Sequence, residues 1–117
     1  MRILTWHVHG SYLYYLVQAR DHEFYLPVKP GKPEGYGGRA GDFPWPDNVF
    51  DIPAEEVRNE RFDVIVFQSR KNYLEDQHET LSAEQREVLE QFAALTSDAN
   101  YEPDQSFMDK VRAVFRQ

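Results

Sequence analysis

Two histidines and a glycine stand where an apolar run ends near the start of the chain. Residues 3–8 form the run and include His7, and His9 and Gly10 follow at once. Side chains two apart on a strand point to the same face, so the two imidazoles share one side. An imidazole can act there as a general base or hydrogen-bond to a hydroxyl or phosphate. The competing interpretation is that both histidines are structural residues that cap the end of the strand.

A glycine-rich stretch is the second candidate for binding chemistry. Residues 35–41 read Gly-Tyr-Gly-Gly-Arg-Ala-Gly, whose backbone N–H groups could cradle an anion while Arg39 adds positive charge. The stretch is no Walker loop, since no Gly-Lys-Ser/Thr ends it, and no dinucleotide fingerprint, since it does not follow the first strand. The alternative is an ordinary surface loop.

Ser69 and Arg70 are the third candidate, because they follow the apolar run of residues 62–67. They could contact a ligand, although Ser69 has no nucleophile-elbow context and plain loop residues are an equal alternative. The two histidines near residue 8 have no third ligand at a recognisable spacing, so we predict no metal site and no cofactor. His22 and His78 fall at element ends and are expected to be solvated.

The elements that must position these residues are short strands. Residues 3–8, 23–26, 49–52 and 62–67 read as strands, with a helix over residues 12–20. The connection between the first two is long enough for a parallel crossover, and residues 62–67 read as a central strand buried on both faces. We therefore predict an α/β fold with a small Rossmann-like parallel sheet of three to four strands. Ligands bind such sheets at the carboxyl ends of the strands, where the candidates lie.

A long loop interrupts this pattern at residues 29–48, which hold five of the six glycines and four of the seven prolines. Its aromatic residues Tyr36, Phe43 and Trp45 favour a loop that packs onto the fold.

Two amphipathic helices are predicted after the sheet. Ser82 and Gln85 form a capping-box pattern ahead of Val88, Leu89, Phe92 and Leu95, which recur at helical spacing. A second apolar stripe begins at Phe107 and continues through Met108, Val111, Val114 and Phe115. We divide the chain into an α/β segment, residues 1–80, and a helical tail, residues 81–117.

Composition narrows the classes of function. The chain has 117 residues and a formal net charge of −7. That size suits one small domain, and the charge repels nucleic acid and anionic membranes. The chain has no cysteine, and it shows neither a signal peptide nor an apolar run long enough to span a membrane. A cytoplasmic protein is the expectation.

Three separated motifs resemble the N-terminal segment of bacterial glycosyltransferases of the GT-B type, in the family-4-like group. They are residues 2–16, the loop residues 36–39 with 43–49, and residues 67–73. The resemblance covers residues 1 to about 80 and implies that His9, Gly10 and Ser11 line the acceptor side of a cleft between two lobes. We assign the catalytic role to His9, and acceptor binding to His7, Gly10, Ser11, Arg39, Ser69 and Arg70.

The tail resembles a different family. Residues 81–95 and 106–115 are similar to the C-terminal tail of DnaJ-type co-chaperones, the segment that pairs two protomers. No His-Pro-Asp tripeptide is present, and without cysteine there is no DnaJ zinc module, so the resemblance implies association and not co-chaperone activity.

Two functions follow as expectations. The first is a truncated or recombined acceptor-side fragment of a sugar-nucleotide-dependent glycosyltransferase, inactive without a donor lobe because transfer needs both substrates held together. Its partner would be a small-molecule or glycan acceptor. The second is a non-catalytic homodimer formed through residues 104–117. Whether the chain is an enzyme is left open, as is its origin as a natural fragment, half of a split enzyme or an engineered sequence.

Overall fold

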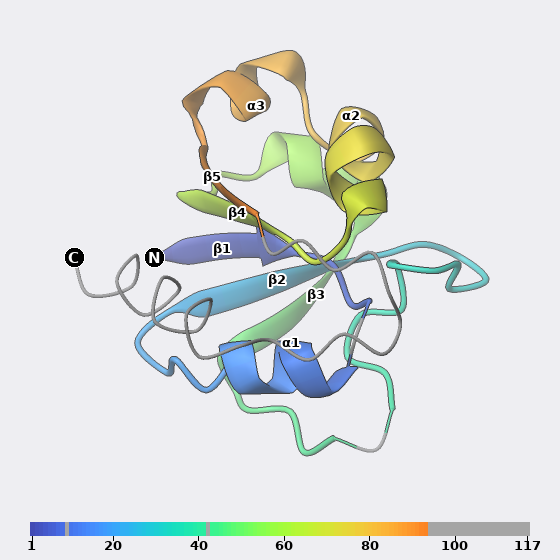
Figure 1. Ribbon diagram of the computed structural model, residues 1–117, viewed down its shortest axis with the longest axis vertical. Helices are drawn as coiled ribbons and strands as arrows, with labels where there is room; N and C mark the ends of the chain where they lie inside the picture. Colours follow the sequence, from blue (N-terminus) through green and yellow to red (C-terminus); the bar gives the residue numbers. More distant parts are fainter. Residues whose placement is uncertain (9, 42, 94–117) are drawn as a thin grey trace.

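The computed structural model describes residues 1–8, 10–41 and 43–93, and they form a parallel sheet of five strands. The strand order is β3-β2-β1-β4-β5, which places the first strand in the middle (Figure 1). The strands are β1 (Arg2–Thr5), β2 (Glu23–Val28), β3 (Val49–Pro53), β4 (Val64–Phe67) and β5 (Glu90–Ala93).

Helices cover both faces of this sheet. Helix α1 (Gly10–Leu16) lies on one side, and α2 (Gln77–Thr80) and α3 (Ala83–Val88) lie on the other (Figure 1). A 3₁₀ helix, η1 (Ala54–Asn59), joins β3 to β4, and a π-helical turn, η2 (Asn72–Asp76), leads into α2. The order of strands reverses between β1 and β4, which in open α/β sheets is the point where ligands bind.

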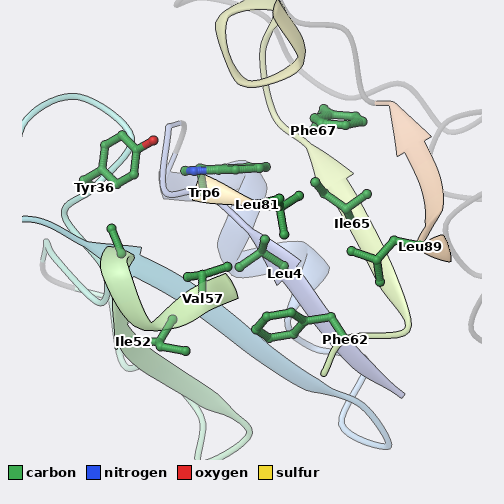
Figure 2. Packing of buried hydrophobic residues seen from close by; sticks show 11 residues of the cluster. Leu4, Trp6, Tyr36, Ile52, Val57, Phe62, Ile65, Phe67, Leu81 and Leu89 are labelled. Atoms are coloured by element: carbon green, nitrogen blue, oxygen red, sulfur yellow. The ribbon is translucent and has the colours of Figure 1, made fainter. Parts of the chain in front are cut away.

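Each face of the sheet has its own hydrophobic core. Ile3, Val64 and Val66 point toward α1, and their neighbours Leu4, Ile65 and Phe67 point the other way, as the two-residue period of a strand requires. Figure 2 shows the second cluster, in which Trp6 lies at the end of the sheet between Tyr36 and Leu81. Packing on the two faces of the sheet fixes the strands that carry the candidate site.

The expected centre of the fold is confirmed. Strands β1 and β2 are parallel neighbours, with Ile3 opposite Phe24, and all four residues of β4 are buried between β1 and β5. An α/β protein with a parallel sheet is therefore the correct class, although the sheet has one strand more than the largest number predicted.

The first helix of the tail ends earlier than predicted, and a strand replaces its second half. The capping box is present, with Ser82 Oγ accepting from Gln85 N and Gln85 Oε1 accepting from Ser82 N. The helix stops at Val88, and residues 90–93 pair with β4 in parallel register. Strand β4 is buried, and its backbone groups need hydrogen-bond partners on both edges. Residues 90–93 provide partners for one edge, and this pairing outweighs the helical spacing of Phe92. The second predicted helix, at residues 104–115, lies outside the described residues.

Helix α1 is also shorter than the predicted span of residues 12–20. The side-chain amide of Asn48 donates to the carbonyls of Val17 and His22 at 3.1 and 2.9 Å. The loop that returns to β3 thus satisfies carbonyls that have no partner after the end of the helix.

His22 is buried, and the expectation that it is solvated is wrong. Its Nδ1 lies 2.8 Å from the amino group of Met1. The ring therefore joins the start of β1 to the turn before β2.

A helical segment that the sequence did not predict runs through η2 and α2, residues 72–80. Its buried residues are polar: Asn72, Asp76, Gln77 and Thr80. Without an apolar stripe, the usual signal of a helix against a core is absent.

Candidate functional site

The loop of residues 29–48 folds over the carboxyl ends of the central strands. His7 and Gly35 form an isolated antiparallel bridge, and Val28 and Gly37 form another. A Cβ placed on Gly35 would lie 3.8 Å from Asn72 Nδ2 and 3.9 Å from Asp76 Oδ2. The loop therefore lies between the end of β1 and the π-helical turn, and we call this place the carboxyl edge.

His7 is fixed in one tautomer at the carboxyl edge. Its Nδ1 lies 2.5 Å from the carbonyl oxygen of Gly38, and a carbonyl only accepts, so Nδ1 carries the hydrogen. In the neutral ring Nε2 is then a hydrogen-bond acceptor. No other hydrogen bond reaches this ring among the residues that the structure describes, so Nε2 is left to accept from a ligand hydroxyl.

Three partly buried aromatic rings lie on one side of His7, and we call Tyr14, Phe43 and Trp45 the aromatic cluster. The rings of His7 and Trp45 meet edge to face with centroids 5.5 Å apart. Tyr14 lies 5.4 Å from Phe43 and 5.9 Å from Trp45. Trp45 Nε1 donates to the carbonyl of Ala40 at 3.2 Å, which ties the ring to its own loop. Aromatic side chains thus adjoin one directed acceptor, and small-molecule sites combine apolar and aromatic side chains with a few placed polar groups.

A buried polar network holds the other side of the loop. Tyr36 Oη lies 2.9 Å from Asp76 Oδ1 and 3.0 Å from Thr80 Oγ1. Asp76 is 1% exposed and also accepts from Asn72 Nδ2 at 2.7 Å and Lys71 Nζ at 2.9 Å. Tyr36 has one hydroxyl hydrogen, and it donates this hydrogen to the carboxylate of Asp76, so Thr80 donates to Tyr36. All the hydrogen bonds of the network are therefore donated in the direction of Asp76.

The network changes the acidity of two of its members. Burial raises the pKa of Tyr36 to about 12, and the charge of Asp76 acts in the same direction. Partial burial lowers the pKa of Lys71, but the hydrogen bond and charge of Asp76 outweigh it and leave the pKa above its usual value. Tyr36 therefore stays neutral and Lys71 stays charged at ordinary pH.

Side-chain hydrogen bonds also join β4 to β1 next to this network. Gln68 Nε2 donates to Thr5 Oγ1 at 2.9 Å, and Thr5 Oγ1 donates to the carbonyl of Val66 at 2.8 Å. Asn72 Oδ1 accepts from Gln68 N at 2.9 Å. The end of β4 is thus held in place on both sides.

The structure brings only some of the predicted site residues together. His7 lies at the carboxyl edge, Gly10 and Ser11 begin α1, and His9 lies outside the described residues. Ser69 Oγ accepts from Asn72 N at 3.2 Å and so starts the next turn, with Arg70 exposed beside it.

Arg39 is held by β3. Its N–H donates to Asp51 Oδ1 at 2.8 Å, and its Nε lies 3.5 Å from the same oxygen. Asp51 lies on β3, at the far end of the sheet from β4. Within the described part of the chain, no hydrogen bond or ion pair joins Arg39 to Ser69 or Arg70.

Sequence reasoning missed Tyr36, Asn72, Asp76 and Thr80 as a unit. Three of them, Asn72, Asp76 and Thr80, are spaced four residues apart, which puts them on one helical face. This polar stripe at helical spacing is the sequence signal that could have predicted the buried network.

Neither a group of potential metal ligands nor a membrane-spanning helix is found in the described ranges. Residues 1–8, 10–41 and 43–93 contain no group of three or more His, Cys, Asp or Glu side chains that could hold a metal ion. None of the helices in those ranges is long and apolar enough to cross a membrane.

The fold and the carboxyl edge define a small parallel α/β domain with a candidate ligand site. A family model for the chaperone protein DnaJ C-terminal region matches residues 84–117. This is under a third of the chain and supports the likeness predicted for the tail. Of the matched residues the structure describes only 84–93, which include most of α3 and all of β5. No curated protein and no solved structure matches the chain.

Proposed function

We propose that this chain is an acceptor-side fragment of a sugar-nucleotide-dependent glycosyltransferase, the first part of its N-terminal lobe. One observation carries the proposal: the three motifs that resemble glycosyltransferases meet at the carboxyl edge. The first supplies His7, whose ring bonds to Gly38 of the second, and Gln68 of the third bonds to Thr5 of the first. These contacts span 31 and 63 residues of sequence, so chain proximity does not account for them.

The chemistry assigned to this lobe is acceptor binding. His7 Nε2 accepts a hydrogen bond from an acceptor hydroxyl, and the aromatic cluster provides the surface on which the rest of the acceptor lies. His9, two residues on, is the proposed general base. A second lobe must provide the sugar nucleotide, because transfer requires donor and acceptor in near-attack geometry.

Two substitutions of His7 separate ligand binding from loop structure. The shorter amide of His7→Asn would place an N–H near the position of Nδ1 and keep a donor for Gly38, but it has nothing at Nε2. The longer amide of His7→Gln would reach the position of Nε2 and lose the bond to Gly38. We expect His7→Asn to weaken the binding of methyl glycosides about tenfold with the loop intact. His7→Gln should disturb the amide signals of residues 35–38 instead.

The measurement is a ¹⁵N-amide titration of the full chain with a panel of methyl glycosides and with non-sugar alcohols. Saturable shifts confined to the carboxyl edge support the proposal. Shifts elsewhere, or none with any compound, overturn it. UDP and GDP sugars should give no saturable binding below the millimolar range. Micromolar binding of either would move the donor site into this lobe and contradict the assignment.

A second function, self-association through the tail, is favoured by the DnaJ match and by the exposed surface at its start. Val88 is 81% exposed, and β5 ends the strand order, so one of its edges has no strand partner among the described residues. An open strand edge can pair with another chain. If residues 104–117 pair the protomers, their deletion should convert a dimer into a folded monomer in light scattering, whereas a dimer that survives the deletion would pair through the edge of β5. A full-length chain that is monomeric at high micromolar concentration would exclude this function.

A further inference from the structure

The carbonyl that holds the His7 ring is close in sequence to a buried tyrosine. Gly38, whose carbonyl oxygen lies 2.5 Å from His7 Nδ1, follows Tyr36 by two residues. Tyr36 is 2% exposed, and its hydroxyl donates to Asp76 Oδ1 at 2.9 Å. Each residue has only two soft backbone torsions, so the place of the Gly38 carbonyl depends on where Tyr36 is held.

Asp76 is the more buried of two carboxylates that attach this part of the loop. It is 1% exposed and accepts from Tyr36 Oη. Two further donors, Asn72 Nδ2 at 2.7 Å and Lys71 Nζ at 2.9 Å, bond to the same carboxylate. The second carboxylate, Asp51, accepts from a backbone N–H of the loop, but it is exposed. Hydrogen bonds are stronger where the local dielectric constant is low, so Asp76 is the stronger attachment.

The tautomer of His7 decides what its second ring nitrogen can bind. With the hydrogen on Nδ1, Nε2 accepts a hydrogen bond from a hydroxyl group. The Gly38 carbonyl is the partner that favours this form, because a carbonyl oxygen can only accept. If that carbonyl moves away, the hydrogen can lie on Nε2 instead, and Nε2 then donates and no longer accepts.

We propose that Asp76 is a positioning residue that controls the tautomer of His7. It acts through the loop: its bond to Tyr36 places the carbonyl that keeps the hydrogen of the ring on Nδ1. Within the described residues, no hydrogen bond joins Asp76 directly to His7. The consequence for acceptor binding rests on the proposed function, whereas the tautomer is a property of the chain without a ligand.

The test is the tautomer of His7, read from the imidazole ¹⁵N chemical shifts of the full chain above the usual titration range of histidine. The unmodified chain should show the Nδ1–H form. Tyr36→Phe deletes the hydroxyl and should lower the ratio of the Nδ1–H to the Nε2–H form about three- to tenfold. Asp76→Ala should lower it at least as far. Adding Tyr36→Phe to Asp76→Ala should change it no further, because the bond that the two residues share is already gone.

Two controls separate positioning from general effects. Tyr25→Phe removes the same atom from a tyrosine that hydrogen-bonds a different carboxylate, that of Glu23. Leu89→Ala lowers stability at the opposite side of the cluster in Figure 2 from Tyr36. Both variants should leave the tautomer ratio of His7 unchanged.

An unchanged ratio in Tyr36→Phe would overturn the proposal, and this variant decides the test alone if Asp76→Ala does not fold. An equal change in either control would overturn it as well. Additive effects of the two substitutions would show that Asp76 does not act through Tyr36 and would contradict it too. Glycoside titration of the same variants tests the proposed function separately. If the ratio responds as expected but even the unmodified chain binds no glycoside, the proposed function fails and the positioning role stands.

Discussion

Strand β4 and the loop of residues 29–48 are both well packed, but the loop depends on polar bonds in addition to apolar burial. Every side chain of β4 is apolar and buried, and the strand lies between two parallel neighbours. The loop buries the Tyr36 ring in the core and is also attached through particular polar bonds, among them His7 to Gly38 and Tyr36 to Asp76. Burial of apolar area is non-directional, whereas each of these hydrogen bonds requires one geometry.

This difference explains where a ligand site can form. A central strand that is stabilised by buried apolar area tolerates polar substitutions poorly, and its backbone donors and acceptors are already paired with the neighbouring strands. The loop binds one nitrogen of the His7 ring, and that residue stays partly exposed beside it. The sheet thus provides rigidity, and the loop and the turns beside it provide the chemistry.

The largest effect is expected in the sheet. Phe67 is fully buried and packs on Trp6 and Tyr73, with ring centroids 6.1 and 5.1 Å away. Phe67→Ala should lower the free energy of unfolding by about 3–5 kcal/mol, through lost transfer energy and the remaining cavity. Chemical denaturation measures the loss. Amide exchange in residues 64–67 of the unmodified chain should be slower than in residues 29–41, and equal rates would mean that β4 is not central.

A backbone change in the loop should have the next largest effect. Gly38 has φ +61°, and a Cβ there would lie 2.5 Å from Asp51 Oδ1 and 2.7 Å from Val28 Cγ2. We expect Gly38→Ala to cost about 2–3 kcal/mol in denaturation, from strain and from displacement of the carbonyl that His7 binds.

Gly31→Ala separates the two causes. Gly31 has φ +78°, but a Cβ added there would have nothing within 4 Å, so this position has the same kind of strain without the clash. The substitution should cost about 1 kcal/mol. Equal losses in both variants would show that the contact with β2 and β3 does not matter, and the loop would then be held less tightly than its hydrogen bonds indicate.

Removing one hydroxyl from the buried network should cost less. Tyr36→Phe keeps the ring and deletes the bonds to Asp76 and Thr80, and we expect a loss of about 1–2 kcal/mol in denaturation. Asp76 retains Asn72 and Lys71 as donors, which limits the damage.

The pH dependence of that variant gives a separate check. The pKa of Tyr36 is about 12 in the folded chain against a usual value of 10.0. Above pH 10 the unfolded state loses a proton that the folded state keeps, so the stability linked to Tyr36 is complete below pH 10 and is lost as the pH rises toward 12. The difference in stability between the unmodified chain and Tyr36→Phe should narrow over that interval. A constant difference would contradict the burial of the hydroxyl.

The sequence was sufficient for the parts of the fold that depend on apolar pattern. Strands β1 to β4 and the capping box at Ser82 follow from local runs and spacing, and all are present. Strand β5 was missed because Phe92 and Leu95 fit a helix equally well, and only the unpaired edge of β4 decides between the two.

The candidate site was less predictable because its contacts, like the pairing of β5, join residues that are far apart in the sequence. His7 could be placed at the end of a strand, but its tautomer depends on Gly38, 31 residues away. Asp76 is buried by contacts with Tyr36 and Lys71 and not by any apolar neighbour in the sequence. Polar networks of this kind have no local period, so they are visible only once the chain is folded.

The smallest effect on stability is expected at Arg39, the loop residue assigned to ligand binding. Its ion pair with Asp51 is exposed on both sides, and the backbone N–H of residue 39 keeps its bond to Asp51 when the side chain is removed. Arg39→Ala should therefore change the free energy of unfolding by only about 0–0.5 kcal/mol. Asp51→Ala removes the acceptor of that N–H as well and should cost about 1 kcal/mol. If Arg39→Ala destabilised the chain as much as Asp51→Ala does, Arg39 would be a structural tie of the loop. If it leaves stability unchanged and weakens glycoside binding, Arg39 belongs to the site, and the loop separates the residues that fold it from those that bind.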